Sequence, residues 1–203
     1  MAANAIDGVP KPSVSDVVEW SDGELRVRAE LQTLAPSPAL SNSITPPPTL
    51  TLDTGWWAEL RAALAALASQ PTDRICLDAR LLERRVRAFF GVAVDLDDVA
   101  WAVAHGDLQW SNVTGPICWL LDWEAWGTAP RGYDAATLYC ASLTDPRLAA
   151  RVHEQFGDLL DSPTGRIAQL AAAAKLLGLV EHGEHPELAA PLHAHAHALY
   201  RRS

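Results

Sequence analysis

Lysine and cysteine are scarce in this sequence. Of 203 residues only two are lysines, Lys11 and Lys175, and only three are cysteines. Cys76, Cys118 and Cys140 are scattered along the chain and form no C-x-x-C pair. This pattern excludes a disulfide-framework miniprotein and predicts reduced thiols in a reducing compartment.

The sequence also lacks long hydrophobic runs and a secretory signal. A membrane-spanning helix needs about 18 consecutive apolar residues. The longest candidate, residues 167–180, is interrupted by Gln169, Lys175 and Gly178. The first residues contain no basic segment followed by an apolar one, so no signal peptide is expected. We therefore expect a cytoplasmic protein.

Positive charge is in deficit. Asp and Glu number 25 against 16 Lys and Arg, which gives a formal net charge of −9. An acidic chain is a poor partner for a nucleic-acid backbone or an anionic membrane, and it suits a cationic ligand better. The chain is 49% hydrophobic and 20% charged. That composition predicts a globular protein of one domain, or of one domain with a small lobe.

Hydrophobic spacing predicts an α+β chain in which helices dominate. Apolar and charged residues alternate over residues 13–34, around a turn at 21–23, which is typical of a half-buried β-hairpin. Residues 35–49 contain five prolines and predict a linker or surface loop, the best candidate for a domain boundary. Helices are expected over residues 53–69, 78–89, 134–143, 146–160, 164–181 and 187–200.

Residues 104–134 hold the pattern that points to chemistry. Asp107 follows His105 and Gly106, and Asn112 comes five residues after Asp107. The apolar run 117–121 predicts one strand of a hairpin, which would deliver Asp122 at its end. Carboxylate and amide oxygens suit Mg²⁺, and the remaining Asp107 could accept a proton from a hydroxyl nucleophile. Together these groups would form the lower half of a phosphoryl-transfer site.

Each of these residues also has a purely structural interpretation. Taken singly, Asp107, Asn112 and Asp122 are ordinary turn or cap residues. For His105 we expect a hydrogen-bonding role that holds the loop, rather than a role as a base. The order and spacing of the whole set favour the chemical interpretation.

The same residues resemble a known family. The segments H-G-D-L-Q-W-S-N and L-L-D-W-E are similar to the catalytic loop and metal-binding segment of aminoglycoside phosphotransferases and choline kinases, which have the protein-kinase-like fold. The later G-Y-D-A-A-T-L resembles the helix start that follows in that family. The resemblance implies that Asp107 is the catalytic base and that Asp134 supports the catalytic loop. It also implies that Asn112 and Asp122 hold Mg²⁺, with ATP as the phosphate donor.

The N-terminal part departs from this family. There is no G-x-G-x-x-G, and neither lysine lies in an apolar strand behind a glycine-rich turn, so no nucleotide-binding lysine is identified. Arg26 or Arg28 could replace it, although a strand next to the hinge would place them wrongly. We therefore expect a kinase-like fold reduced mainly to its helical C-lobe. Residues 1–50 would be an N-lobe remnant with the hairpin and a proline-rich hinge, and residues 51–203 the C-lobe. The missing N-lobe elements have three alternative explanations, which are a start codon further upstream, a truncated gene copy and a genuine short form.

Tryptophan and histidine are concentrated locally. Five of the eight tryptophans lie within residues 101–126, where core packing is their ordinary role. Trp110, Trp123 and the neighbouring Glu124 are candidates for lining a cleft beside the metal. His193 and His197 share a helical face at a spacing that can bind Zn²⁺, and a solvated helix is the simpler interpretation.

The expected function is ATP-dependent phosphoryl transfer to a small-molecule hydroxyl, with a cationic acceptor in keeping with the acidic charge. Because the glycine-rich loop and the lysine are missing, we expect weak or no activity from this chain alone. The alternative is a non-catalytic, pseudokinase-like module that binds a cationic small molecule or a protein partner. A third interpretation is a C-lobe completed by another chain, since the hairpin edge is unpaired. Uncovered apolar strand faces could also promote self-association.

Overall fold

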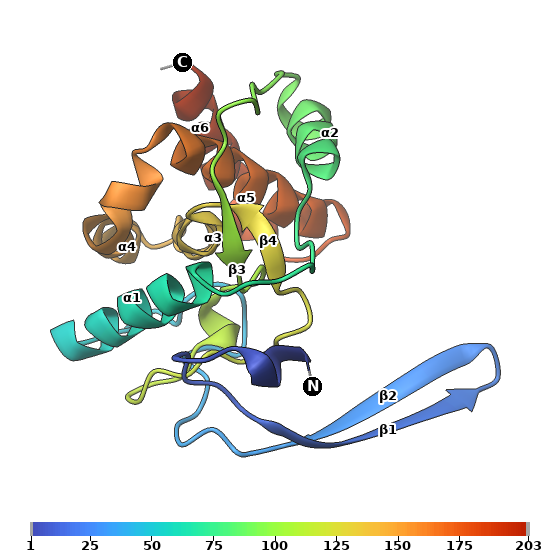
Figure 1. The fold of residues 1–203 in the computed structure, drawn as a ribbon. Helices are drawn as coiled ribbons and strands as arrows, with labels where there is room; N and C mark the ends of the chain where they lie inside the picture. Colours follow the sequence, from blue (N-terminus) through green and yellow to red (C-terminus); the bar gives the residue numbers. More distant parts are fainter. Residues whose placement is uncertain (1, 202–203) are drawn as a thin grey trace.

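The computed structural model describes residues 2–201 and has an α+β architecture (Figure 1). Two small antiparallel sheets are present, β1–β2 and β3–β4, and helices make up most of the regular structure. This confirms the expected α+β class. In chain order the elements are η1 (Ala2–Ala5), β1 (Val14–Asp22), β2 (Leu25–Gln32), α1 (Thr54–Ala68), α2 (Ala79–Phe90), β3 (Trp101–Ala104), η2 (Trp110–Asn112), β4 (Gly127–Pro130), α3 (Tyr133–Ala141), α4 (Pro146–Leu160), α5 (Pro163–Glu181), η3 (Pro186–Leu188) and α6 (Ala189–Tyr200).

Helix α5 is the centre of the helical body. It packs against α2, α3, α4 and α6, and its small residues 171–174 are buried. The start of α5 lies directly against the end of α4, because a Cβ added at Gly165 would lie 1.9 Å from the carbonyl oxygen of Leu159. Only glycine allows this approach. The apolar residues of α5 and of the four helices that it contacts therefore pack into one core.

Polar side chains mark the starts of α1, α2, α4 and α5. Asp53 accepts a hydrogen bond from the amide of Trp56 and begins α1, and Asp78 begins α2 in the same way. Asp145 and Ser162 cap α4 and α5. These caps satisfy backbone N–H groups that a helix leaves unpaired at its first turn. The predicted helix ranges are confirmed within about two residues. For these four helices the caps are readable in the sequence.

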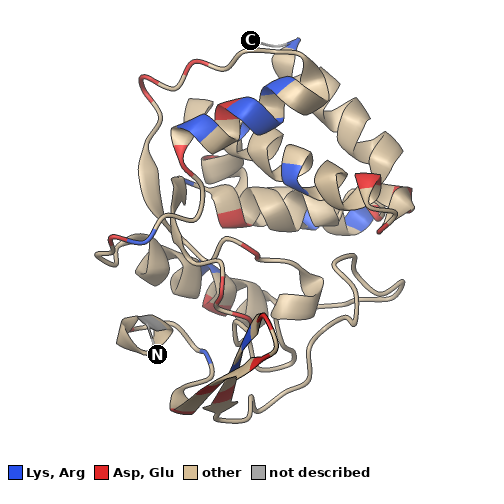
Figure 2. Ribbon diagram, turned by 90° about the vertical axis from the view of Figure 1, so that its right-hand side faces the viewer, with Lys and Arg blue, Asp and Glu red and all other residues tan. Residues whose placement is uncertain are grey.

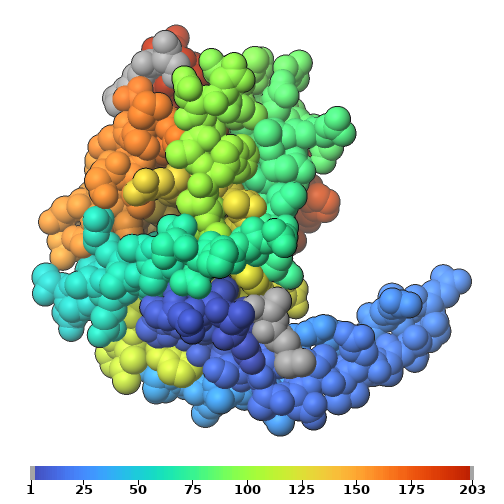
Figure 3. Space-filling view, viewed as in Figure 1, coloured from blue at the N-terminus to red at the C-terminus, as the bar shows by residue number. Residues whose placement is uncertain are grey.

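The predicted hairpin forms, but its apolar face is not buried. Trp20 lies opposite Val27 and Glu19 opposite Arg28, so one face is apolar and the other is charged. Four large apolar residues of the first face are 48–68% exposed: Val18, Trp20, Leu25 and Leu31. The expectation of a half-buried hairpin is therefore wrong. Among residues 2–201 the two strands pair only with each other, and the hairpin extends from the body as an arm (Figure 3).

The proline-rich segment packs onto the body. The Leu40 amide donates to the Val113 carbonyl at 2.8 Å, and the Trp110 amide donates to the carbonyl of Ile44. Ile44 is buried in the same core as Ile6 and the helices. The expected boundary near residue 50 therefore does not divide the core, and only the hairpin stands apart from it.

The expected strand over residues 117–121 is replaced by an irregular loop. A single bridge joins Val113 to Leu120, and the Thr114 amide donates to the Trp119 carbonyl. Strand β3 instead pairs with β4, with Ala104 opposite Gly127. The apolar run is buried in part by packing, which does not require ladder hydrogen bonds. Asp122 still follows this run directly.

Charged residues of both signs are distributed over the helices and loops (Figure 2). Basic residues gather on α2, whose sequence is ARLLERRVRAFF, and acidic residues on the loop that follows it. No helix within residues 2–201 combines the length and hydrophobicity needed to cross a membrane.

The histidines of α6 do not form a metal cluster. His193 and His197 are exposed, and His195 lies against α5, with its Nε2 3.0 Å from Oε1 of Gln169. Among the described residues, no group of three or more His, Cys, Asp or Glu side chains could hold a metal ion. The zinc interpretation therefore gains no support, and His195 has a packing role.

His195 should make the stability depend on pH. Burial, with a smaller effect of the nearby His153, lowers the pKa of His195 from 6.5 to about 4. Between these values the unfolded chain binds a proton that the folded chain does not, so stability falls as the pH drops from 6.5 to 4. We expect His195 to account for a loss of about 2–3 kcal/mol between pH 7 and pH 4.

Urea denaturation of His195→Gln tests this expectation, because glutamine keeps an N–H donor for Gln169 but does not titrate. The variant should lose less stability at acid pH than the wild type. His193→Gln, an exposed change on the same helix, is the control and should behave as the wild type. Equal pH dependence in His195→Gln and the wild type would contradict the assignment.

Candidate active site

The loop that follows β3 is held by a buried carboxylate from α3. Asp134 Oδ2 accepts a hydrogen bond from the His105 amide at 2.7 Å, and Oδ1 accepts one from the Gly106 amide at 2.9 Å. Asp134 is 6% exposed, and burial raises the pKa of its carboxyl, opposed by His105 and by the two amides. The start of α3 thus fixes the backbone immediately before Asp107.

His105 joins this loop to the segment that carries Asp122. The buried ring has its Nε2 2.8 Å from the Leu121 carbonyl, and its Nδ1 faces the Asp107 amide at 3.4 Å. The ring meets the edge of Trp123 at a centroid distance of 4.7 Å. Burial lowers the pKa of His105, which favours a neutral ring that donates from Nε2 and accepts at Nδ1. These contacts match the loop-holding role expected for His105.

Gly106 allows the loop to pass close to its neighbours. Its φ is +84°, a conformation that favours glycine. A Cβ at this position would lie 2.5 Å from Sγ of Cys76 and 2.6 Å from the carbonyl oxygen of Ala125. The glycine therefore sets both the direction of the loop and its distance from the Asp122 segment.

The carboxylate of Asp107 is contacted from two sides. Lys175 Nζ, from α5, lies 2.5 Å from Oδ1. On the other side, Nδ2 of Asn112 donates to the Asp107 carbonyl at 2.9 Å and to Oδ2 at 3.2 Å. Nε2 of Gln109 lies 3.4 Å from Oδ2, and Oε1 of Gln109 is buried with no partner among the described residues. Asp107 is thus oriented by three donors on two elements.

Asn112 and Asp122 lie on neighbouring segments of chain. The Leu121 amide donates to the Asn112 carbonyl at 2.9 Å, which brings the residue before Asp122 beside Asn112. Asn112 is 7% exposed, and Asp122 is exposed with a φ of 61°, which is unusual for a residue other than glycine. Strained residues of this kind gather at functional sites.

The donor set at this point fits Mg²⁺ in its chemistry. Asp122 offers a carboxylate and Asn112 an amide oxygen, and Mg²⁺ commonly takes one or two protein oxygens while keeping water and phosphate ligands. The described residues hold no larger cluster of acidic or histidine ligands. A bound magnesium ion would therefore depend on phosphate and water for the rest of its coordination.

A cavity of about 690 Å³ lies between the charged face of the hairpin and the Asp122 segment. Arg28 and Arg74 line it together with Asp122, so the structure places Arg28 beside the expected metal residue, contrary to the expectation for a strand next to the hinge. The other lining residues are Ala3, Pro12, Val14, Glu30, Gln32, Trp123, Glu124 and Trp126.

Of the three residues expected to line a cleft, two do so. Trp123 and Glu124 face the cavity, whereas Trp110 is fully buried. Trp110 packs on Trp56 and Trp57, and its indole N–H donates to Oγ of Ser142 at 2.9 Å. The expectation for Trp110 is corrected: this ring anchors the loop of Asp107 in the core.

Sequence reasoning missed Lys175 and Arg74. Lys175 lies 68 residues from Asp107 along the chain, within the apolar stretch AAAAKLLGL of α5. A single charge in such a stretch was the available signal, since a lysine buried there needs an anionic partner. Arg74 donates to the carbonyls of Glu124 and Trp126 and stacks over the Trp126 ring. No local sequence pattern indicates these contacts.

No family model matches the chain, and neither does any curated protein or solved structure.

Proposed function

We propose that this chain binds a magnesium–ATP complex and transfers the terminal phosphoryl group to the hydroxyl of a small molecule. The observation that carries the proposal is the joining of Asp107 and Asn112 on one loop, beside the segment of Asp122. The resemblance of these residues to aminoglycoside phosphotransferases and choline kinases supports the same assignment.

Phosphoryl transfer requires positioning and charge neutralisation more than covalent chemistry from the protein. Asp107 would orient the acceptor hydroxyl and accept its proton at Oδ2, which has only long contacts of 3.2 and 3.4 Å in this structure. Asn112 and Asp122 would hold Mg²⁺, which supplies positive charge to the phosphate oxygens when bound. His105 and Asp134 would keep the loop in place.

Arginine would supply the phosphate contacts that a lysine makes in the resembled family. Arg74 directs two of its donors to the carbonyls of Glu124 and Trp126, and within residues 2–201 no carboxylate forms an ion pair with it. Its charge is therefore available to an anionic ligand in the cavity. Arg28 is already shared by Glu19 and Glu30, so we assign it a weaker role.

A binding module without catalysis is the second candidate, and one observation favours it. No glycine-rich segment covers the cavity among the described residues, and such a segment normally holds the phosphates in line. We therefore expect slow turnover even where nucleotide binds. Glu124 lines the cavity, so either function suits a ligand that carries amino groups.

Calorimetry of Mg²⁺–ATP binding separates these functions. The wild type should bind, and Asp122→Ala should weaken binding at least about tenfold, because it removes the carboxylate proposed to hold the ion. Asp97→Ala, which removes an exposed carboxylate from the loop before β3, is the matched control and should bind as the wild type.

Transfer is then measured as phosphorylated product from a panel of aminoglycosides and amino alcohols. Binding without product would favour the binding module. Absence of Mg²⁺–ATP binding in the wild type, or equal binding in Asp122→Ala, would refute the proposed site.

A further inference from the structure

Lys175 is the cation in closest contact with Asp107. Its ammonium lies 2.5 Å from Oδ1 of Asp107 and donates to the carbonyl of Gly106 at 2.8 Å. The two side chains are 22% and 25% exposed, so the pair is largely shielded from water. Within residues 2–201, no other Lys or Arg forms an ion pair with Asp107.

Placing the Lys175 ammonium in an apolar part of α5 is energetically unfavourable, which suggests a functional reason for its contact with Asp107. Helix α5 is otherwise apolar around it, with buried alanines on one side and buried Leu176 and Leu177 on the other. Burying an ammonium loses hydration, which a single ion pair barely offsets. A methionine at this position would pack as well without that cost.

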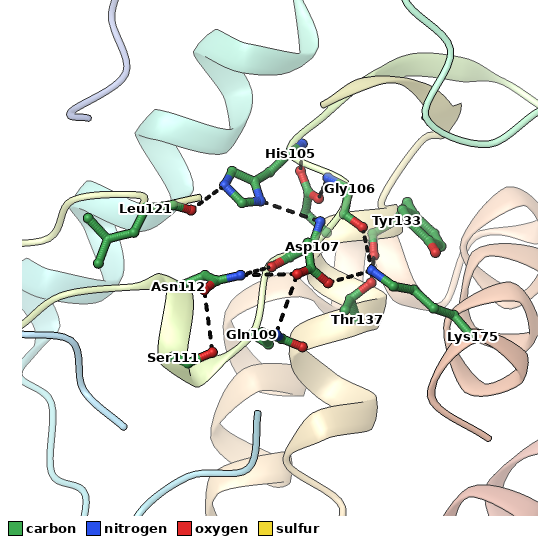
Figure 4. Close-up of polar contacts among 11 residues, drawn as sticks. His105, Gly106, Asp107, Gln109, Ser111, Asn112, Leu121, Tyr133, Thr137 and Lys175 are labelled. Carbon is green, nitrogen blue, oxygen red and sulfur yellow. Dashed lines mark hydrogen bonds and ion pairs between the residues drawn. The ribbon is translucent and has the colours of Figure 1, made fainter. Parts of the chain in front are cut away.

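The two oxygens of Asp107 have different surroundings. Oδ1 has one short contact, to Lys175, whereas Oδ2 has two long contacts, to Asn112 and Gln109. Figure 4 shows Lys175 reaching the carboxylate from the side of α5 and Asn112 from the opposite side. The carboxylate is thus held by one short contact at Oδ1 and by two longer contacts at Oδ2.

We infer that Lys175 is a positioning residue of the site, and this inference rests on the proposed phosphoryl transfer. It holds Asp107 by Oδ1 and fixes the preceding carbonyl, so that Oδ2 faces the acceptor hydroxyl. The rate of such a reaction depends strongly on the position of the reacting groups, since an error of about 1 Å can lower it roughly 10²-fold. Lys175 acts through Asp107 and makes no contact with the reacting groups itself.

The pairing can be observed without any activity, because the chain has only two lysines. Labelling lysine with ¹³C at Cε should give two signals, which Lys175→Arg assigns. In Asp107→Asn the Lys175 signal should shift, while that of Lys11, which donates to the Ile6 carbonyl, should stay in place. An unchanged Lys175 signal in Asp107→Asn would overturn the inference.

Kinetics test the positioning role. Lys175→Met should lower kcat by about 10–100-fold and leave the KM for ATP within about twofold, because Asp107 is misplaced while the nucleotide contacts remain. Lys175→Arg should recover most of kcat, and Lys11→Met is the matched control. Methionine fits an apolar helix face, and thermal denaturation will show whether the variant is folded.

The outcomes are distinguishable from failure of the proposed function. Unchanged kcat in Lys175→Met overturns the positioning role, even if the wild type is an active phosphotransferase. Equal losses in Lys175→Met and Lys175→Arg also contradict it. If the wild type transfers no phosphate, the proposed function fails, and so does the role of Lys175 in positioning Asp107 for transfer. The labelling experiment still decides whether Lys175 pairs with Asp107.

Discussion

Replacing Asp107 with asparagine should lower phosphoryl transfer by roughly 10³-fold and leave the affinity for Mg²⁺–ATP within about twofold. Asparagine has nearly the same shape, and its oxygen can still accept from Nδ2 of Asn112, so the loop should keep its conformation. The variant removes the group that accepts the hydroxyl proton and the anionic partner of Lys175. The loss should therefore appear in kcat, measured as product formed at saturating ATP.

Asp97→Asn is the matched control for this prediction. It makes the same chemical change on an exposed loop before β3, and product formation should equal that of the wild type. A loss of less than tenfold in Asp107→Asn would show that Asp107 is not the base. Loss of nucleotide binding together with transfer would show that Asp107 belongs to the metal-binding set instead.

The fold was predictable where its signals are local. Helices begin at Asp53, Asp78 and Asp145, whose capping role depends on the next few residues only. The contact between Asp107 and Asn112 was likewise predictable, because the two residues are separated by a fixed spacing that brings them together. In both cases the interacting residues are close in the sequence, so the contact can be predicted from their spacing.

Contacts between distant segments were not predictable in the same way. Lys175 reaches Asp107 only because α5 lies at the centre of the helical body. Arg28 lines the cavity because the charged face of the hairpin turns toward the Asp122 segment. A single sequence shows that the strands are amphipathic, and it does not show which face is covered. For the same reason the exposure of Val18 and Trp20 was not foreseen.

Asp134→Ala should lower the free energy of unfolding by about 3 kcal/mol at pH 7. The variant leaves the buried amides of His105 and Gly106 without an acceptor, and each such bond to a carboxylate contributes about 1.5–3 kcal/mol. The two bonds together would contribute about 3–6 kcal/mol. The variant also removes the cost of burying a carboxylate, so we expect a loss at the lower end of this combined range. Urea denaturation measures the change, and transfer should fall as well because the loop of Asp107 loses its support.

The matched control is Asp145→Ala, because Asp145 also accepts from two backbone amides, those of Arg147 and Leu148. Asp145 is less buried than Asp134, so water can replace its carboxylate, and a lost helix cap of this kind costs about 1 kcal/mol. Burial is then the only major difference between the two changes. Equal losses in the two variants would mean that the His105 and Gly106 amides reach water when Asp134 is removed. The loop of Asp107 would in that case owe its conformation to Trp110 and the core beneath it rather than to α3.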